Sequence, residues 1–562
     1  MEDTELKKLL FLLLVVLAAC NQPVKQLSRG PADWIYVSTT GNDLTGDGTS
    51  AAPYATIATG ISHASAGDTV FIVAGTYNVS TQIVLPVGVS LMGEGDVSDI
   101  HFTYQCPSFD NGINTAAITL SSVVENTPGN QSISYLKLDG DMTSTNPILV
   151  KRRGNVKIHH CTIVDFAWIG VYFDNAPNLI TPPTIRAAGN EIYDCTIDNC
   201  ANTAGTWTGG ALIGFIGQDG ILIHDNLLYQ NSRAEGLNGS ICTSYGRGYS
   251  RRMKYYNNKS YKPDYDGTAW NFHLELMNGW GGDEIYNNEF YDGDVPIDIA
   301  GSIGHFKGDD DYACRIYDNY FTGTPVQTYH GKYSIDIECF LSEDFYIYNN
   351  HFYNIPAPLH LSAGTYPNGN TRRIYFYYNL LSMLGWNDPT KYNTCIDLYA
   401  PGTATLNDVY IFNNVIEGDG VTHTALKINN NNIMNNIQII NNIILNHTNG
   451  AWLLLENTGT LDSLRIENNL MYNNSYSNLI RINAGTTGTN YVNQNNILGS
   501  NPLFKSNETF RLRPTSPAID AGIDVGLTTD YWGHRVPQNG TPDIGACEYG
   551  NYVLFYNGKQ LY

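Results

Sequence analysis

Short runs in which every second residue is apolar recur along this chain of 562 residues, and they come in pairs. Val295–Ile299 is followed by Cys314–Tyr317, and Tyr333–Cys339 is followed by Phe345–Tyr348. A period of two in segments rich in Ile, Tyr and Val, with Gly, Asn and Asp between them, predicts strands with one buried face. Outside the N-terminal region, helical spacing is confined to a short segment at 55–64.

A polar corner follows the second strand of each pair and repeats at a regular interval. Its second polar residue falls at Cys161, Cys195, Asn226, Asn258, Asn288, Asn319, Asn350, Asn379, Asn414, Asn442, Asn469 and Asn496. Successive positions are 27 to 35 residues apart, so each repeat is one unit of strands stacked on its neighbours. Asparagine suits such a corner because it tolerates the left-handed conformation and can bond to the same amide one coil away. The sequence therefore predicts an all-β, single-stranded parallel β-helix of about a dozen or more coils.

Both ends of the chain carry motifs that resemble those of one superfamily. The segments Trp34–Asp43, Gly46–Thr49, Pro53–Ile57, Ala66–Val70 and Gly75–Tyr77 resemble the first part of secreted, right-handed β-helix proteins of the pectate-lyase-like superfamily. The segments Phe510–Pro514, Ser516–Gly522 and Asp543–Glu548 resemble the C-terminal closing segment of many bacterial members. The resemblance implies a right-handed parallel β-helix with a short C-terminal cap. It does not choose a function, because the superfamily contains lyases, hydrolases, epimerases and non-catalytic adhesins.

Four parts are expected along the chain: a lipoprotein signal peptide (1–20), a flexible tether (21–32), the β-helix (33–505, with an N-terminal block at 33–100) and the closing segment (506–562). Lys7 and Lys8 precede an apolar run, Leu9–Leu17, that is too short to span a bilayer. The residues up to Cys20 resemble a bacterial lipoprotein signal, which implies lipidation of Cys20 and a lipid anchor at the outer membrane or cell surface. An ordinary secretory signal with an incidental Cys20 is the alternative, and both predict a location outside the cytoplasm.

The net charge of −22, from 31 basic and 53 acidic residues, argues against nucleic acid and anionic lipid as partners. Contact with a membrane is therefore expected through the N-terminal anchor alone. Ten cysteines include Cys20, and the other nine lack CxxC or zinc-like spacing. Cys161 and Cys195 occupy consecutive corners, where stacked thiols or one disulfide would serve a structural role.

Aligning the first strand of each coil by its apolar residues predicts one acidic stripe of outward side chains. The stripe contains His273, Glu275, Asp298, Asp336, Glu338, His360 and Asp397, and it continues to Lys427 and Arg481. Carboxylates stacked about 4.8 Å apart repel one another. A bound cation, a neighbouring base or a raised pKa would offset this repulsion, and the last supplies a proton donor beside an ionised partner.

The stripe supplies our candidate catalytic residues, Glu275, Asp298, Asp336, Glu338 and His273. Carboxyl groups on adjacent coils would suit retaining glycoside hydrolysis, and groups on alternate coils would suit inversion. His360 and Asp397 are assigned to substrate binding. The alternative is that outward residues on a solvated sheet are polar by default.

A basic segment, Arg247–Lys262, contains six basic residues and no acidic one. It suggests an anionic ligand, such as a uronic or sulfated sugar, held by Arg251, Arg252 or Lys259. Trp270 and Trp280 lie nearby in the sequence and could stack on sugar rings. The alternative is that these bases neutralise neighbouring acids.

Ca²⁺ is the one cofactor that the sequence suggests, and no metal ligands are assigned. Asn42, Asp43, Asp47 and Asp309–Asp311 offer oxygen ligands in loops flanked by glycine. None of these loops has EF-hand spacing, and solvated turns are the default interpretation.

The sequence thus predicts an extracellular protein that cleaves a polysaccharide, an acidic one in view of the basic segment, with glycoside hydrolysis favoured. A polysaccharide lyase acting on uronic-acid polymers is an alternative. Chondroitinase-B-like lyases have an arginine in a motif similar to Asn271–His273 and a lysine one coil earlier; here the residue is His273, and Ile241–Tyr245 has no lysine. A non-catalytic, glycan-binding surface protein is the other alternative.

Overall fold

The structure is a computed structural model of the full chain. It describes residues 33–105, 115–144, 146–178, 181–201, 210–230, 239–244, 250–262, 271–293, 295–301, 305–306, 312–323, 333–355, 357–363, 368–383, 394–418, 420, 424–430, 433–447, 453–474, 480–487, 490–550, 554–556 and 559–561. The predicted signal peptide and tether, with Cys20, lie outside these residues.

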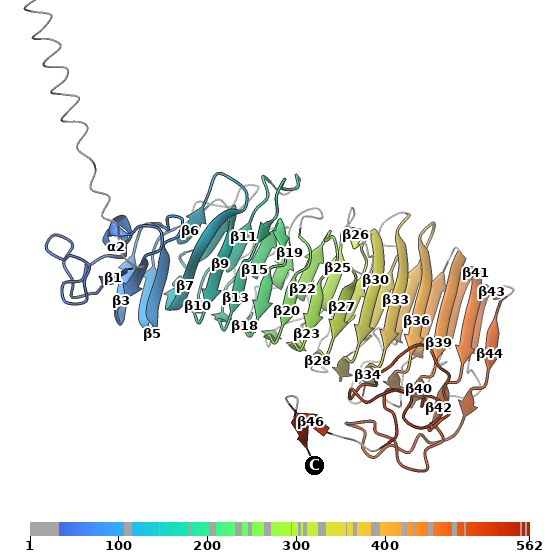
Figure 1. The fold of residues 1–562 in the computed structure, drawn as a ribbon. Coiled ribbons are helices and arrows are strands. Elements are labelled where there is room, and N and C mark those ends of the chain that lie inside the picture. The colour runs from blue at the N-terminus through green and yellow to red at the C-terminus, as the bar shows by residue number, and fades with distance from the viewer. Residues whose placement is uncertain are drawn as a thin grey trace, which may run out of the picture.

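The chain winds as a right-handed parallel β-helix, as predicted, and each full coil contributes one strand to each of three parallel sheets (Figure 1). Sheet A contains β4 (Ile83–Val84), β6 (Ile118–Ser121), β8 (Ile148–Lys151), β11 (Val171–Asp174), β15 (Ala211–Ile216), β19 (Gly239–Ser244), β22 (Asn271–Met277), β25 (Val295–Ala300), β29 (Ile335–Ile337), β32 (Leu359–Ser362), β35 (Thr394–Ala400), β38 (Thr424–Asn430), the first part of β41 (Leu453–Glu467) and β43 (Ile480–Thr487).

Sheet B follows sheet A in each coil. It contains β1 (Trp34–Val37), β2 (Thr69–Ile72), the first parts of β5 (Ser90–Phe102) and β7 (Thr127–Asp139), β9 (Arg153–His159), β13 (Glu191–Tyr193), β17 (Leu222–His224), β20 (Lys254–Tyr256), β23 (Glu284–Tyr286), β27 (Cys314–Tyr317), β30 (Leu341–Tyr348), β33 (Asn370–Tyr377), β36 (Thr405–Phe412), β39 (Ile433–Ile440), the end of β41 and β44 (Val492–Gln494).

Sheet C follows the polar corner. It contains β3 (Gly75–Val79), the ends of β5 and β7, β10 (Thr162–Val164), β14 (Thr196–Asp198), β18 (Leu227–Tyr229), β21 (Lys259–Lys262), β24 (Glu289–Asp292), β28 (Tyr320–Thr322), β31 (His351–Tyr353), β34 (Leu380–Ser382), β37 (Val415–Glu417), β40 (Ile443–Leu445), β42 (Leu470–Tyr472) and β45 (Ile497–Leu498). Two short strands, β12 (Ala187–Ala188) and β16 (Gln218–Asp219), pair beside the A–B corner, and β26 (His305–Phe306) pairs with β30.

One continuous apolar core fills the inside of the solenoid from Ile35 to Met471. Equivalent residues of successive coils stack on each other; for example, the rings of Phe290, Phe321 and Phe352 are 5.0 and 4.6 Å apart. Because each coil packs on its neighbours, the fold fixes which residues of adjacent coils lie side by side.

The polar corner between sheets B and C is an amide ladder, as predicted. In a typical rung, Asn258 Oδ1 accepts from the backbone N–H of Asn226 (3.1 Å) and from its Nδ2 (2.9 Å), while Asn258 Nδ2 donates to Asn288 Oδ1 and Ile223 O. These bonds satisfy polar groups that are buried in every coil. The left-handed residue is the one before the ladder position, such as Asn257 (φ 55°) and Asn287 (φ 54°), and not the ladder asparagine itself.

The two ends of the β-helix are built differently. The helix α2 (Ile57–His63), capped by Thr56, packs Ile57 and Gly60 into the first coils and confirms the predicted helical segment. The closing segment packs on the side of the last coils, where Asn413 and Asn441 at the B–C corner bond to the backbone of Asp543, Gly545 and Ile523. A hairpin of β46 (Leu554–Tyr556) and β47 (Lys559–Leu561) follows.

The eight described cysteines are buried thiols, so Cys161 and Cys195 are stacked at interior corners and do not form a disulfide. Within the described part of the chain, no helix has the length and apolarity needed to cross a bilayer.

Candidate functional site

The acidic residues predicted to align do so on the outward face of sheet A. The backbone register pairs Glu275 with Asp298, Asp298 with Asp336, Asp336 with His360, His360 with Asp397 and Asp397 with Lys427. We call Glu275, Asp298, Asp336, His360 and Asp397 the acidic column. Its strands, β22 to β35, occupy the middle of the solenoid (Figure 1).

The column is not an open, solvated surface. Asp298 and Asp336 are each 4% exposed, His360 is 7% exposed and Asp397 is 8% exposed, whereas Glu275 is half-buried. Burying charged groups costs free energy unless they are paired. Outward polar residues that are present by default would be solvated, so this burial distinguishes the column from an ordinary sheet surface.

Asp336 and His360 form a hydrogen-bonded pair at the centre of the column, with Oδ1 of Asp336 2.8 Å from Nδ1 of His360. The ring of Tyr333 stacks on the imidazole at a centroid distance of 3.8 Å. Burial favours the neutral imidazole, but the negative charges of Asp336, Asp397 and Glu338 outweigh it and raise the pKa of His360 above its ordinary value. The pair therefore holds its proton more tightly than a solvated histidine does.

Glu275 is the first carboxyl group of the column, and two hydroxyl groups hold it. Its Oε2 accepts from Ser240 Oγ at 2.7 Å and from Thr243 Oγ1 at 3.3 Å. Removal from water raises the pKa of Glu275, although these hydrogen bonds and the charge of Lys262 oppose the rise. Thr243 is the register partner of Glu275 on β19, so the sequence alignment already places it beside that carboxyl group, although it was not predicted as a site residue.

Glu338 follows Asp336 by two residues and is half-buried. Its charge is among those that raise the pKa of His360. The structure thus brings five predicted site residues and Glu338 to one outward surface.

The prediction that His273 faces outward is wrong. His273 is fully buried; its Nε2 donates to the carbonyl oxygen of Asp292 (2.7 Å), so its Nδ1 accepts from Ser260 Oγ (2.7 Å). Burial and the nearby charge of Lys262 lower the pKa of His273 to about 3. His273 lies near the start of β22, and the equivalent residue of the previous coil, Ile241, also lies in the core. His273 is therefore a neutral interior residue and is not a catalytic one.

The basic residues predicted to bind substrate are paired with acids and do not lie on the column. Arg251 and Arg252 contact Asp219 at 2.9 and 2.6 Å, beside the A–B corner. Lys259 lies on sheet C and contacts Glu289 at 2.8 Å. The structure agrees with the alternative interpretation, in which these bases neutralise neighbouring acids.

The two predicted aromatic residues have different outcomes. Trp270 lies outside the described residues. Trp280 is 42% exposed in the turn after β22, where the Arg186 guanidinium lies 6.0 Å from its ring centroid, at the A–B corner. It belongs to the surroundings of Arg251 rather than to the acidic column.

In the loops considered for Ca²⁺, the side-chain oxygens accept hydrogen bonds that hold the turns together. Asn42 Oδ1 accepts from the N–H groups of Leu44 and Thr45, and the Asp43 carboxylate accepts from those of Ala55 and Thr56. Asp47 likewise accepts from Thr49. Asp309–Asp311 lie outside the described residues.

One other group on sheet C, Asp99, His101 and Asp139, has ligand atoms close enough for a metal ion. The ammonium of Lys137 lies 3.2 Å from carboxylate oxygens of both aspartates and compensates their charge.

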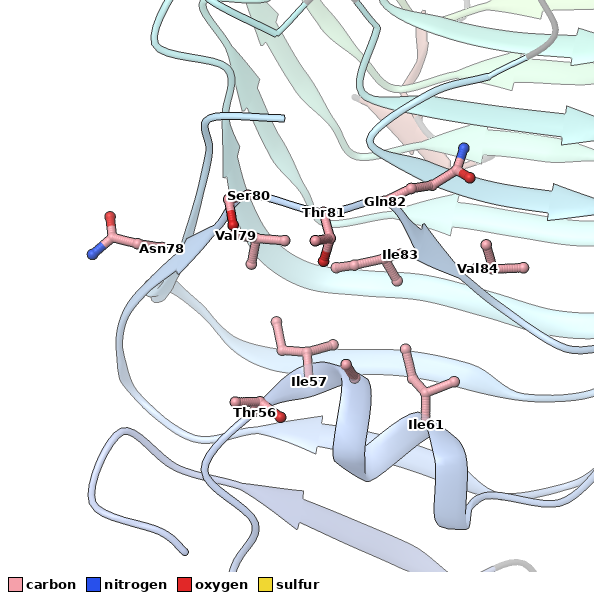
Figure 2. Close-up of a pocket in the computed structure, with 11 residues that line it drawn as sticks. Thr56, Ile57, Ile61, Asn78, Val79, Ser80, Thr81, Gln82, Ile83 and Val84 are labelled. Carbon is pink, nitrogen blue, oxygen red and sulfur yellow. The ribbon is translucent and has the colours of Figure 1, made fainter. Parts of the chain in front are cut away.

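A pocket of about 340 Å³ lies at the N-terminal end of the solenoid. Ile57 and Ile61 of α2 face the segment 78–84 across it, with a rim of uncharged polar residues (Figure 2). Many coils separate it from the acidic column, and its lining has no ionisable group. It offers no acid or base for catalysis.

Comparison with known proteins finds one matching family and several similar solved structures. Residues 39–231 match a family described as a protein of unknown function, DUF1565. No curated protein matches the chain significantly.

Among solved structures, the catalytic domain of an α-1,3-glucanase of family GH87, in complex with tetrasaccharides, is 12% identical with a TM-score of 0.39 and covers 74% of this chain and 66% of its own. The Agl-KA catalytic domain is 14% identical with a TM-score of 0.38, covering 77% and 63%. The chain thus spans less than two thirds of the length of these two chains.

PfbA, a surface adhesin of Streptococcus pneumoniae, is 12% identical with a TM-score of 0.34, and 75% of this chain and 85% of that chain are covered. Similarity at this level does not extend to an activity.

Proposed function

We propose that this protein is an extracytoplasmic, carbohydrate-active enzyme that hydrolyses a polysaccharide at the acidic column. The observation that carries the proposal is the buried Asp336–His360 pair between the carboxyl groups of Asp298 and Asp397. Glycoside hydrolysis needs a proton donor and a carboxylate on opposite sides of the scissile bond, and the column provides both.

In the proposed reaction, the Asp336–His360 pair donates its proton to the glycosidic oxygen as the bond from that oxygen to the anomeric carbon breaks. Asp397 takes a proton from a water molecule, whose oxygen attacks the anomeric carbon from the other side. His360, which carries the donated proton, and Asp397 lie on adjacent coils, about 4.8 Å apart along the sheet. Asp336 and Asp397, the carboxyl groups on either side of the imidazole, are two coils apart, roughly 9 to 10 Å, which is at the upper limit of the carboxyl spacing for inversion. Glu275, Asp298 and Glu338 would accept hydrogen bonds from sugar hydroxyl groups.

An uncharged polysaccharide suits this site better than the acidic one that the basic segment suggested. Arg251, Arg252 and Lys259 are paired with acids away from sheet A, and the column itself carries several carboxyl groups for one histidine. A uronic-acid polymer would meet like charge there. The same argument disfavours a uronate lyase, which needs cationic groups around the substrate carboxylate.

The test is turnover of a panel of neutral and acidic polysaccharides by the wild-type chain and by Asp336→Asn. We expect release of reducing ends from a neutral polysaccharide, and a 10²- to 10⁴-fold lower kcat in the variant with little change in binding. Asp194→Asn, at an exposed corner, is the matched control and should keep full activity. An unsaturated uronide product would show a lyase instead, and binding without any turnover would show an adhesin.

We also propose that the protein is held at a bacterial membrane by a lipid on Cys20, as the residues around Cys20 suggest. Mass spectrometry of the mature N-terminus should show a diacylated Cys20. A soluble N-terminus elsewhere would show an ordinary secretory signal.

A further inference from the structure

A second outward column runs along sheet B and consists of aromatic rings. His159, Tyr193, His224, Tyr256, Tyr286, Tyr317, Tyr348 and Tyr377 occupy register-paired positions on eight consecutive strands. Neighbouring rings are 4.5 to 5.1 Å apart and within 11° of parallel. We call these residues the aromatic ladder.

The ladder follows from the repeat itself. The ring residue comes two positions before the corner residue, which is Cys161 or Cys195 in the first two coils and asparagine in the others. The apolar residue before the ring, such as Ile285 or Ile316, is in the core. Alternation then turns the ring outward. A stack of this kind stabilises the sheet through contacts between the faces of neighbouring rings. The outer edges of the rings take no part in these contacts.

Those edges carry hydroxyl groups that face solvent. Within the described part of the chain, the hydroxyl groups of Tyr193, Tyr256, Tyr286 and Tyr348 make no hydrogen bond to the protein, although their rings are half-buried. The Tyr317 hydroxyl reaches Glu284 at 3.5 Å. The result is a row of hydroxyl groups on successive coils from Tyr256 to Tyr348, and Tyr193 continues it beyond His224, whose two ring nitrogens contact Asp225 and Glu191.

The charges beside the ladder are paired on one side and acidic on the other, where Asp194 and Asp225 lie at exposed corners. In the adjacent outward column, Lys157 pairs with Glu191 at 2.6 Å, and Lys254 pairs with Glu284 at 3.4 Å. The side chains of these two lysines are 48% and 45% exposed, so the face is open to solvent. A hydroxyl-rich surface with paired bases and an acidic border disfavours an anionic polymer and suits a partner without charge.

We propose that the aromatic ladder is a second, non-catalytic binding surface, which takes an uncharged polysaccharide in an extended conformation lying along the solenoid axis. A polymer whose sugar units repeat at about the coil spacing of 4.8 Å can place one unit over each rung. Each hydrogen bond is weak, but one chain bonds to many rungs at once, so the contributions multiply. β-1,4-Linked glucan is a neutral polymer with this extended form.

The aromatic ladder and the acidic column lie on different sheets, so a substitution can remove binding at one without affecting catalysis at the other. The closing segment packs against Tyr377, the last ring of the ladder. Binding there would hold the protein on an insoluble substrate while the acidic column acts on chains that reach sheet A.

The test is binding of the full chain to microcrystalline cellulose, with polygalacturonate as the charged comparison. The variant Tyr256→Phe/Tyr286→Phe/Tyr317→Phe keeps the stack and removes three hydroxyl groups. The matched control is Tyr229→Phe/Tyr261→Phe/Tyr291→Phe, a stack on sheet C with ring distances of 4.7 and 4.5 Å. We expect at least a tenfold loss of affinity for cellulose in the first variant and none in the control, with turnover of soluble oligosaccharides unchanged in both.

The proposal would be overturned if the wild-type chain did not bind cellulose, if both triple variants lost binding equally, or if the first variant bound as the wild type does. Tighter binding to polygalacturonate than to cellulose would also overturn it. Cellulose binding by Asp336→Asn separates this proposal from the proposed hydrolysis. The variant should lose turnover at the acidic column but still bind cellulose, because the aromatic ladder is unchanged.

Discussion

The acidic neighbours of His360 stabilise its protonated form and so make the stability of the fold depend on pH. Its pKa is raised in the folded chain by Asp336, Asp397 and Glu338, whereas an unfolded histidine titrates near 6.5. The folded state therefore binds the proton more tightly. The resulting stabilisation is complete below about pH 6.5 and is lost as the pH rises through the raised pKa.

The variant Asp336→Asn removes the main charge that holds this proton. We expect the wild-type chain to lose stability between about pH 6 and about pH 9, and the variant to lose less over the same range. Urea unfolding at the two pH values measures both differences. Equal losses in the two chains would show that His360 and Asp336 do not share a proton.

Asp283 also has a raised pKa, so it gives the same sign of pH dependence, although here the neutral form is favoured by burial. It is buried before β23, where its Oδ1 accepts from the backbone N–H of Met253 at 2.8 Å, and burial raises its pKa to about 7. Because the unfolded carboxyl group titrates near 3.8, stability falls as the pH rises from there towards 7, by at most roughly 4 kcal/mol.

An amide in place of this carboxyl group keeps the acceptor without the charge. We expect Asp283→Asn to stabilise the protein at neutral pH and to have little effect near pH 4. Thermal unfolding at the two pH values is the measurement, with Asp225→Asn at an exposed corner as the control. A variant that is less stable at pH 7 would contradict a protonated Asp283.

At this scale the sequence predicted the column because apolar residues mark the inward side of each strand. Glu275, Asp298, Asp336, His360 and Asp397 all follow that alternation. His273 does not, because two consecutive residues face inward near the start of its strand, as Ile241 and Cys242 do in the previous coil. The partners of Arg251 and Lys259, Asp219 and Glu289, lie about one coil away in sequence and become neighbours only through the register.

At the scale of the element, the asparagine ladder carries much of the corner's stability. Asn319 Oδ1 accepts from the backbone N–H and from Nδ2 of Asn288, and its own Nδ2 donates to Ile285 and Asn350. Removing the amide leaves buried groups on both neighbouring coils without partners.

We therefore expect Asn319→Ala to lower the free energy of unfolding by about 2–4 kcal/mol. Asn496 is the last and more exposed rung, so Asn496→Ala should cost less than half as much. Chemical denaturation of the two variants is the measurement. Equal effects at the buried and the terminal rung would argue against the ladder as a source of stability.

The asparagine ladder and the aromatic ladder differ in how far the sequence repeat predicted them. Amide bonding between coils was expected from the spacing of the asparagines alone. The aromatic ladder was not, although tyrosine precedes the polar pair at Tyr286, Tyr317 and Tyr348, because its stacking depends on ring orientation in three successive coils.

At the scale of the whole molecule, a solenoid displays three long faces that can carry separate functions. Sheet A carries the acidic column, sheet B carries the aromatic ladder, and the closing segment covers the B–C corner of the last coils (Figure 1). The period and the strands predicted this architecture. The side position of the closing segment was not predictable, because it depends on bonds between Asn413 or Asn441 and residues about a hundred positions later.

The most direct test of the central claim is a crystal structure of Asp336→Asn with a bound neutral oligosaccharide. We predict that the sugar lies on the outward face of sheet A, with a glycosidic oxygen within hydrogen-bond distance of His360 and with Asp397 near the adjoining anomeric carbon. An oligosaccharide bound only on another face, with the acidic column untouched, would contradict hydrolysis at this site.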